Sequence, residues 1–194
     1  MSRLDQQLSF ALEIDKLKSI LRQTLVTDGS RRENSAEHSW QLAVMAMLFV
    51  EYAPQPMDVN RAIRLALAHD LVEIYAGDAP AYDAAANVNK EEREREAARR
   101  LFGQLPAEQG AELHRLFTEF EQVETNESRY VNALDRLQPL LHNRRTAGGS
   151  WITHQVKRAQ VMERMDPIRT GMPEVWPTVV AIVDDACSKG WIRE

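Results

Sequence analysis

Residues 35–52 read SAEHSWQLAVMAMLFVEY, and the rest of the chain is interpreted outward from them. The part from 42 to 50 is apolar around nearly the whole helical circumference, which predicts a helix at the centre of the protein. Asn34 or Ser35 can cap its first turn, and Glu37 places a negative charge near its positive end. We therefore expect a core helix from about residue 35 to 52.

Further helices are predicted on both sides, because prolines and glycines separate the periodic segments of the chain. They span about residues 5–25, 60–77, 90–102, 107–120, 128–141, 153–168 and 173–188. The alternation typical of strands is nearly absent, and no heptad repeat indicates a coiled coil. The sequence therefore predicts an all-α fold, an irregular helical bundle, in a single domain over residues 1–194.

Composition excludes several classes of function. The net charge is −5, so no excess of basic residues favours nucleic-acid binding. Cys187 is the only cysteine, which rules out an intramolecular disulfide and a cysteine-based zinc site. No signal peptide and no apolar stretch long enough to span a membrane is found, so we expect a cytoplasmic protein.

Potential metal ligands are concentrated in residues 68–78, which read AHDLVEIYAGD. In a regular helix His69 and Glu73 are four residues apart and Asp70 and Glu73 three, so they share one face. Burying these groups unpaired among apolar neighbours would be costly. A divalent cation would offset that cost, which makes this stretch a candidate metal site.

Two residues from other segments complete the candidate site. His38 lies at the start of the core helix, and Asp135 is a single acid on the apolar stripe of residues 133–141. Two imidazoles and two carboxylates suit Mn²⁺, Fe²⁺, Co²⁺, Ni²⁺ or Zn²⁺, and leave positions open on a six-coordinate ion. Taken singly, His38 can be an ordinary histidine, Asp135 can pair with Arg136 or Arg144, and Asp78 can be a turn residue. The remaining histidines, which we interpret as surface or structural residues, are His114, His142 and His154.

The order His, His-Asp, Asp resembles the HD-domain metal-dependent phosphohydrolase superfamily. The resemblance extends to LKSILRQ (17–23), ENSAEHSW (33–40), HDLVEIYAGD (69–78), REREAARRLFGQLP (93–106) and ALDRLQPLL (133–141). These motifs resemble the subgroup that includes bacterial 5′-deoxynucleotidases, over about residues 17–176.

The resemblance implies a role for each matching residue. The implied metal ligands are His38, His69, Asp70 and Asp135. Glu73 is implied to activate or orient the attacking water, Asp78 to lie near the sugar hydroxyls, and Arg22 to contact the phosphate. Gln23 and Thr24 follow Arg22, where the deoxynucleotidases carry a tryptophan that helps to exclude a 2′-hydroxyl. The resemblance therefore does not imply a preference for deoxyribose. Other basic candidates for the phosphate are Arg31, Arg32 and Arg136.

The expected function is that of a metal-dependent phosphomonoesterase acting on nucleoside 5′-monophosphates through a metal-activated water. The expected cofactor is one divalent ion (Mn, Co, Fe, Ni, Zn or Mg), and the expected partner is a small phosphate ester, neither nucleic acid nor membrane. A homodimer is expected because the resembling nucleotidases form dimers and Trp151, Trp176 and Trp191 offer more aromatic surface than a small bundle buries. A lid over residues 77–88 is permitted by that segment's length and small residues.

Three alternatives stay open on the sequence. A phosphodiesterase of the same superfamily often uses a second metal, for which the segment between Asp70 and Asp135 offers only His114 as a further histidine. A nucleotide triphosphohydrolase needs more basic residues. A non-catalytic metal-binding regulatory module would not need Glu73 and Asp78 beside the ligands.

Overall fold

The computed structural model describes residues 1–79, 82 and 88–194. Its first half contains α1 (Arg3–Glu13), η1 (Ile14–Ser19), β1 (Leu21–Leu25), β2 (Arg32–Asn34), α2 (Ser35–Leu48), η2 (Val50–Tyr52), α3 (Val59–Ala68), η3 (His69–Val72) and α4 (Glu73–Ala76). Its second half contains α5 (Lys90–Phe102), α6 (Ala107–Gln122), α7 (Asn126–Arg145), α8 (Gly149–Thr153), α9 (Arg158–Met165), α10 (Pro167–Gly171), η4 (Pro173–Val175) and α11 (Trp176–Ser188). The expected all-α class is confirmed.

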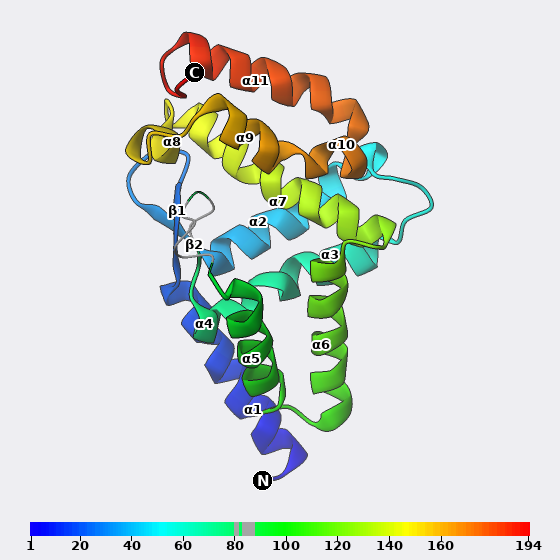
Figure 1. The fold of residues 1–194 in the computed structure, drawn as a ribbon. Helices are drawn as coiled ribbons and strands as arrows, with labels where there is room; N and C mark the ends of the chain where they lie inside the picture. The colour runs from blue at the N-terminus through cyan, green and yellow to red at the C-terminus, as the bar shows by residue number, and fades with distance from the viewer. Residues whose placement is uncertain (80–81, 83–87) are drawn as a thin grey trace.

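The main core surrounds α7, which packs against α2 and α3 on one side and against α9, α10 and α11 on the other (Figure 1). Its buried side chains include Leu134, Leu137 and Leu140. A second, smaller apolar cluster joins α1, η3, α5 and α6 through Phe10, Val72, Leu101, Phe102 and Phe117. The turn η3, which carries His69 and Asp70, follows α3 of the main core and contributes Val72 to the smaller cluster.

The helix expected at the centre of the protein is α2, and that expectation is wrong in part. Asn34 caps α2 through a reciprocal pair of hydrogen bonds with Glu37, as the sequence predicts. Leu42 and Ala46 are buried, but Trp40 is 65% exposed and Leu48 is 66% exposed. The helix ends at Leu48 and not near residue 52. A helix that is apolar around its whole circumference can be buried on all sides or can expose an apolar face to solvent. The sequence pattern alone does not distinguish the two cases.

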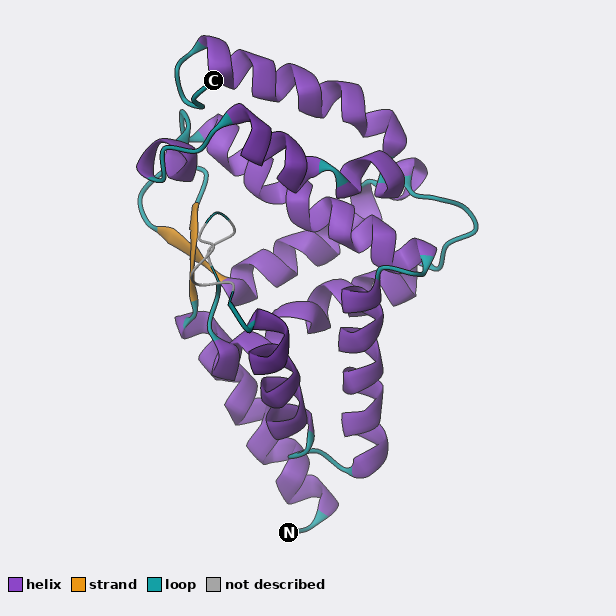
Figure 2. Cartoon of the chain, in the orientation of Figure 1, coloured by secondary structure: helices purple, strands orange, loops and turns teal. Residues whose placement is uncertain are grey.

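The predicted first helix is also shorter than expected. It ends at Glu13, continues as a 3₁₀ turn to Ser19, and gives way to an antiparallel hairpin of β1 and β2 (Figure 2). Arg22 and Thr24 are the buried residues of β1, so the strand carries its polar side chains inward. This pattern inverts the usual apolar alternation, which explains why the strand was missed.

Other segments differ in smaller ways. The helix predicted over 60–77 changes to a 3₁₀ turn at His69, and the one predicted over 153–168 is divided into α9 and α10, with α8 before them. Pro139 lies inside α7, within the helix predicted over 128–141. Trp151 is fully buried, and the rings of Trp176 and Trp191 are half-buried under the cations of Arg169 and Lys189, so these tryptophans do not form the open surface that was expected.

Two further expectations concern the membrane and the lid. Among the described residues, no helix has both the length and the apolar character needed to cross a membrane. The lid expected over residues 77–88 falls mostly on residues 80–81 and 83–87, which lie outside the described residues.

Candidate metal centre and the adjoining cavities

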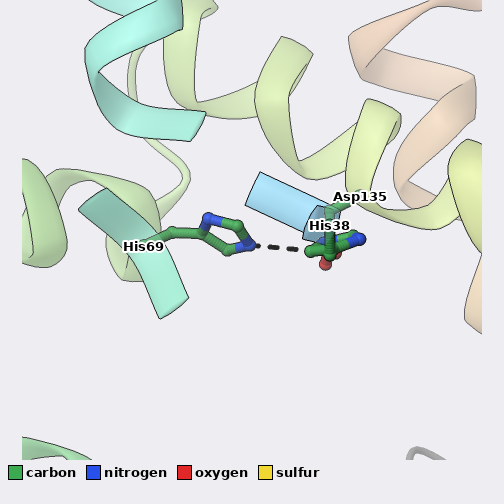
Figure 3. A group of neighbouring side chains, drawn as sticks. All are labelled: His38, His69 and Asp135. Atoms are coloured by element: carbon green, nitrogen blue, oxygen red, sulfur yellow. Dashed lines mark hydrogen bonds and ion pairs between the residues drawn. The ribbon is translucent and has the colours of Figure 1, made fainter. Parts of the chain in front are cut away.

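His38, His69 and Asp135 point toward one another from α2, η3 and α7, as Figure 3 shows. Their potential ligand atoms all lie within 4.8 Å of one another, and all three residues are buried. The core places them there, because α2, α3 and α7 pack together and η3 continues directly from α3. Three residues far apart in the sequence thus share one site with the geometry of a metal centre.

His38 has one ring nitrogen that lacks a suitable protein partner. Its Nδ1 lies 3.2 Å from the side-chain oxygen of Gln138, whose amide nitrogen in turn donates to Glu33 at 2.6 Å. That donation fixes the amide orientation, so Nδ1 carries the proton. Burial, and after it the charge of Arg22, lowers the pKa of His38, so the ring is neutral. The lone pair of Nε2 then faces Asp135 Oδ1 at 2.9 Å.

His69 shows the same arrangement. Its Nδ1 lies 2.9 Å from the carbonyl oxygen of Ala66, which can only accept a hydrogen bond. Its Nε2 is buried without a hydrogen-bond partner, although Asp70 Oδ1 lies 3.1 Å away. A buried nitrogen lone pair beside a carboxylate is unfavourable unless a cation lies between them. Both histidines therefore fit a divalent metal ion, and the mixed nitrogen and oxygen donors suit the metals that the sequence predicts.

Asp70 lies at the edge of this group. Its Oδ2 accepts a hydrogen bond from Arg22 at 2.9 Å and is 3.8 Å from His38 Nε2. Asp135 is buried between His38 and the guanidinium of Arg136. Burial acts to raise the pKa of Asp135, but Arg136 and His38 hold it well below its usual range, so the carboxylate stays charged. The four residues predicted as metal ligands are thus brought together, while the ligand set itself stays a prediction.

Glu73 begins α4 and lies beside the centre, where Ser35 donates a hydrogen bond of 2.5 Å to its carboxylate. Burial and then the charge of Asp70 raise its pKa well above the usual value. The sequence argument assumed a regular helix, yet residues 69–72 form a 3₁₀ turn, in which side chains three apart are eclipsed. Asp70, Glu73 and His69 still line one cavity.

Two cavities adjoin the centre. One, of about 360 Å³, is lined by His69, Asp70 and Glu73 together with further acids, and the other, of about 440 Å³, is lined by residues of β1, α7, α8 and α9. Asp78 borders both cavities, and burial raises its pKa. The larger cavity has mixed walls, with Leu140, Trp151 and Met165 beside polar groups such as Asn143.

Arg22, which the resemblance assigned to the phosphate, is enclosed by carboxylates. Besides its hydrogen bond to Asp70, its Nε is 3.6 Å from Glu33 and its Nη2 is 3.8 Å from Asp135. Burial acts to lower its pKa, but Asp70 and Asp135 raise it, so the guanidinium stays charged. Arg22 borders both cavities, although its charge is already shared among three acids.

Sequence reasoning missed several residues of the site. Glu33 and Gln138 are buried and hold the His38 ring, and burial raises the pKa of Glu33 to about 7. Arg164 on α9 borders both cavities. One signal was available, since Gln138 lies three residues after Asp135 and so shares its helical face. His142 is buried and structural, as predicted, with Nδ1 3.0 Å from the carbonyl oxygen of Leu25.

The chain is similar to known proteins in both sequence and structure. The model of the HD domain family matches residues 14–176. The 5′-deoxynucleotidase HDDC2 of Homo sapiens is 31% identical over 135 residues, and the 5′-deoxynucleotidase hdd1 of Schizosaccharomyces pombe is 28% identical over 133 residues. The human match covers 69% of this chain and 65% of the relative, and the yeast match covers 64% of each, so the chain spans slightly less than two thirds of these relatives.

Solved structures are similar as well. A protein of Magnetospirillum magnetotacticum MS-1, described as a predicted metal-dependent phosphohydrolase, is 52% identical with a TM-score of 0.95, covering 100% of this chain and 97% of that one. A conserved hypothetical protein of Pyrococcus furiosus has a TM-score of 0.64 at 23% identity, covering 93% of this chain and 99% of that one, and it shares the fold alone.

Proposed function

Because the chain belongs to the HD domain family, we propose that it is a metal-dependent phosphohydrolase that hydrolyses nucleoside 5′-monophosphates. The observation that carries the proposal is the pair of buried imidazole nitrogens, His38 Nε2 and His69 Nε2, which lie 2.9 Å from Asp135 Oδ1 and 3.1 Å from Asp70 Oδ1 and converge with Asp135 on one site. The nucleotide is supported by the names of the relatives, which are 5′-deoxynucleotidases.

The proposed metal ligands are His38, His69, Asp70 and Asp135. Their donors suit Mn²⁺, Fe²⁺, Co²⁺, Ni²⁺ or Zn²⁺, and Mg²⁺ is included in the test below. When bound, such an ion supplies a Lewis acid for a phosphate oxygen and lowers the pKa of a water. The positive charge of Arg22 adds to that of the ion and holds Asp70 in place at 2.9 Å.

Glu73 is proposed to accept the proton of the attacking water. Its carboxylate borders the same cavity as His69 and Asp70, and the hydroxyl of Ser35 fixes one of its oxygens. A carboxylate that Ser35 orients beside the proposed ligands suits acceptance of a proton from water. The products are inorganic phosphate and the alcohol, here a nucleoside.

The larger cavity is proposed to hold the nucleoside. Its volume of about 440 Å³ lies within the range of small-molecule sites, and its apolar walls beside Asn143 and Asp78 suit a base and a sugar. Gln23 also borders it, from the position after Arg22. The resembling deoxynucleotidases carry a tryptophan beside the arginine that helps to exclude a 2′-hydroxyl, whereas residue 23 is a glutamine here. The test therefore compares dAMP with AMP.

The experiment measures phosphate release by chelator-stripped protein with Mn²⁺, Co²⁺, Mg²⁺ or Zn²⁺ restored, on nucleoside monophosphates and sugar phosphates. We expect metal-dependent release that Asp70→Ala abolishes and Asp184→Ala retains, because Asp184 is an exposed acid of α11 that pairs with Arg158. If no monophosphate is hydrolysed with any metal, the monoesterase proposal is wrong. Release from diesters or triphosphates instead would assign the site to another hydrolysis reaction.

A homodimer and a cytoplasmic location are proposals too. An apolar stripe on α2, formed by Trp40, Val44, Met47 and Leu48, is exposed and supports self-association, for which light scattering in solution is the test. A single cysteine supports a reducing compartment.

A further inference from the structure

The two cavities beside the metal centre share one wall, and three of its side chains are arginines. Arg22, Arg136 and Arg164 border both cavities, together with Asp78 and Asp135. The charges of the three arginines repel one another, so each needs a counter-ion close by.

The counter-ions are distributed unevenly. Arg22 has three carboxylates within 3.8 Å, those of Asp70, Glu33 and Asp135. Arg136 forms an ion pair with Asp135, which the proposed metal ion would share. Among the residues that the structure describes, Arg164 makes no hydrogen bond or ion pair. Within the described part of the chain, one basic residue at the shared wall is thus left without a partner, and a second has only a shared one.

The surroundings of Arg164 point to an anion. Burial, and after it the charge of Arg136, lowers its pKa to about 10. The groups facing it are the cations Arg136 and Arg22, the carboxylate of Asp135 and the hydroxyl of Tyr82. Arg158 on the same helix shows the ordinary alternative, because it is partly exposed and pairs with Asp184 at 2.8 Å. Arg164 instead borders both cavities, and among the described residues no acid pairs with it.

We propose that Arg136 and Arg164 form an anion subsite that binds the phosphate group of the substrate at the boundary between the two cavities. This inference rests on the proposed function and deepens it, by naming residues that hold the group to be cleaved. Arginine suits the role, because its planar fork of N–H donors matches phosphate oxygens and stays charged. The nucleoside would then extend into the larger cavity, whereas Glu73 borders the smaller one.

The test uses inorganic phosphate as the probe and the full chain as the protein. Phosphate affinity is measured by calorimetry at constant ionic strength, for chelator-treated protein and for protein loaded with Mn²⁺. The variants are Arg164→Gln, Arg164→Lys and Arg136→Gln, with Arg158→Gln as the matched control on the same helix. Circular dichroism and thermal unfolding establish that each variant folds. If Arg164→Gln does not fold, Arg136→Gln tests the subsite in its place.

We expect Arg164→Gln to weaken phosphate binding about tenfold with or without metal, since hydrogen bonds to charged groups are strong. Arg164→Lys should recover part of the loss, and Arg158→Gln should bind as the parent protein does. If dAMP is hydrolysed, Arg164→Gln should raise its KM more than it lowers kcat. Phosphate binding that disappears on removal of the metal and is unchanged in both glutamine variants would overturn the proposal, as would no phosphate binding at all.

The two proposals can fail separately. Phosphate binding that depends on Arg164 in a protein without turnover would keep the anion subsite and reject the phosphomonoesterase. Turnover with a KM and a phosphate affinity unchanged in Arg164→Gln and Arg136→Gln would keep the enzyme and reject the subsite.

Discussion

His38 and His142 are both buried and both contact Gln138, but the partners of their ring nitrogens differ. His142 is 4% exposed, and both of its ring nitrogens have neutral partners, the carbonyl oxygen of Leu25 and the amide groups of Gln138 and Gln41. His38 is fully buried, yet its Nε2 faces a carboxylate, and His69 repeats this arrangement. Burial of a histidine is therefore a poor indicator of a site, whereas a lone pair directed at a carboxylate is a good one.

Removing a carboxylate from the centre is expected to have the largest effect on function. Asp70→Ala takes away the oxygen 3.1 Å from His69 Nε2 and leaves Arg22 without its hydrogen-bonded partner. We expect metal binding and phosphate release to be lost together, as measured by calorimetry and by phosphate assay. His142→Leu is the control and should keep both. Normal turnover in Asp70→Ala would show that the centre is not the reaction site.

Glu73→Gln separates the metal from the proton transfer. The amide keeps the volume of the side chain and can still accept from Ser35, but it cannot take a proton. We expect an unchanged metal affinity and a kcat lower by about 10²–10⁴-fold, the usual contribution of a general base. A kcat near that of the parent protein, with the metal bound, would contradict the role given to Glu73.

Gln138→Leu tests the support of the His38 ring. The substitution removes the oxygen 3.2 Å from Nδ1, so the ring loses the partner that directs Nε2 toward the centre. Loss of such an orienting partner typically weakens metal binding about 10–100-fold. Gln41→Leu is the matched control, because Gln41 contacts the same amide and His142 but makes no hydrogen bond with His38. Equal effects of the two variants on metal affinity would mean that general packing, and not the ring, is responsible.

The smallest effect is expected at the structural histidine. His142→Leu leaves the carbonyl of Leu25 without its hydrogen-bond donor, and an unsatisfied buried polar group costs about 1–3 kcal/mol. Chemical denaturation should show that loss in the free energy of unfolding, and the metal affinity should not change. A large loss of metal binding in this variant would place His142 in the centre.

Sequence and structure agree best where side chains repeat with a helical period and face either solvent or core. The charged run over 90–102 matches α5 to the residue, because Ala97, Ala98, Leu101 and Phe102 supply its buried face. The segment 133–141 was likewise placed on a helix with its acid directed inward.

The parts that were missed bury polar groups. Arg22 and Thr24 lie on the buried face of β1, and Glu33, Gln138 and Arg164 are polar residues that composition assigns to the surface. Their partners are distant in the chain, as with the pair of Glu33 and Gln138. Secondary-structure propensity and hydrophobic periodicity describe neighbouring residues and not pairs that are distant in the chain. Such pairs are therefore seen only in the folded structure.

The most direct test of the central claim is the number of Mn²⁺ ions bound by the chelator-stripped chain, counted from the electron paramagnetic resonance signal of the free ion. We expect one ion per chain in the parent protein. We expect none in the double variant His38→Gln/His69→Gln, in which folding is verified by circular dichroism. Undiminished binding in that variant, or no binding in the parent protein, would contradict the claim that the two imidazole nitrogens hold a metal.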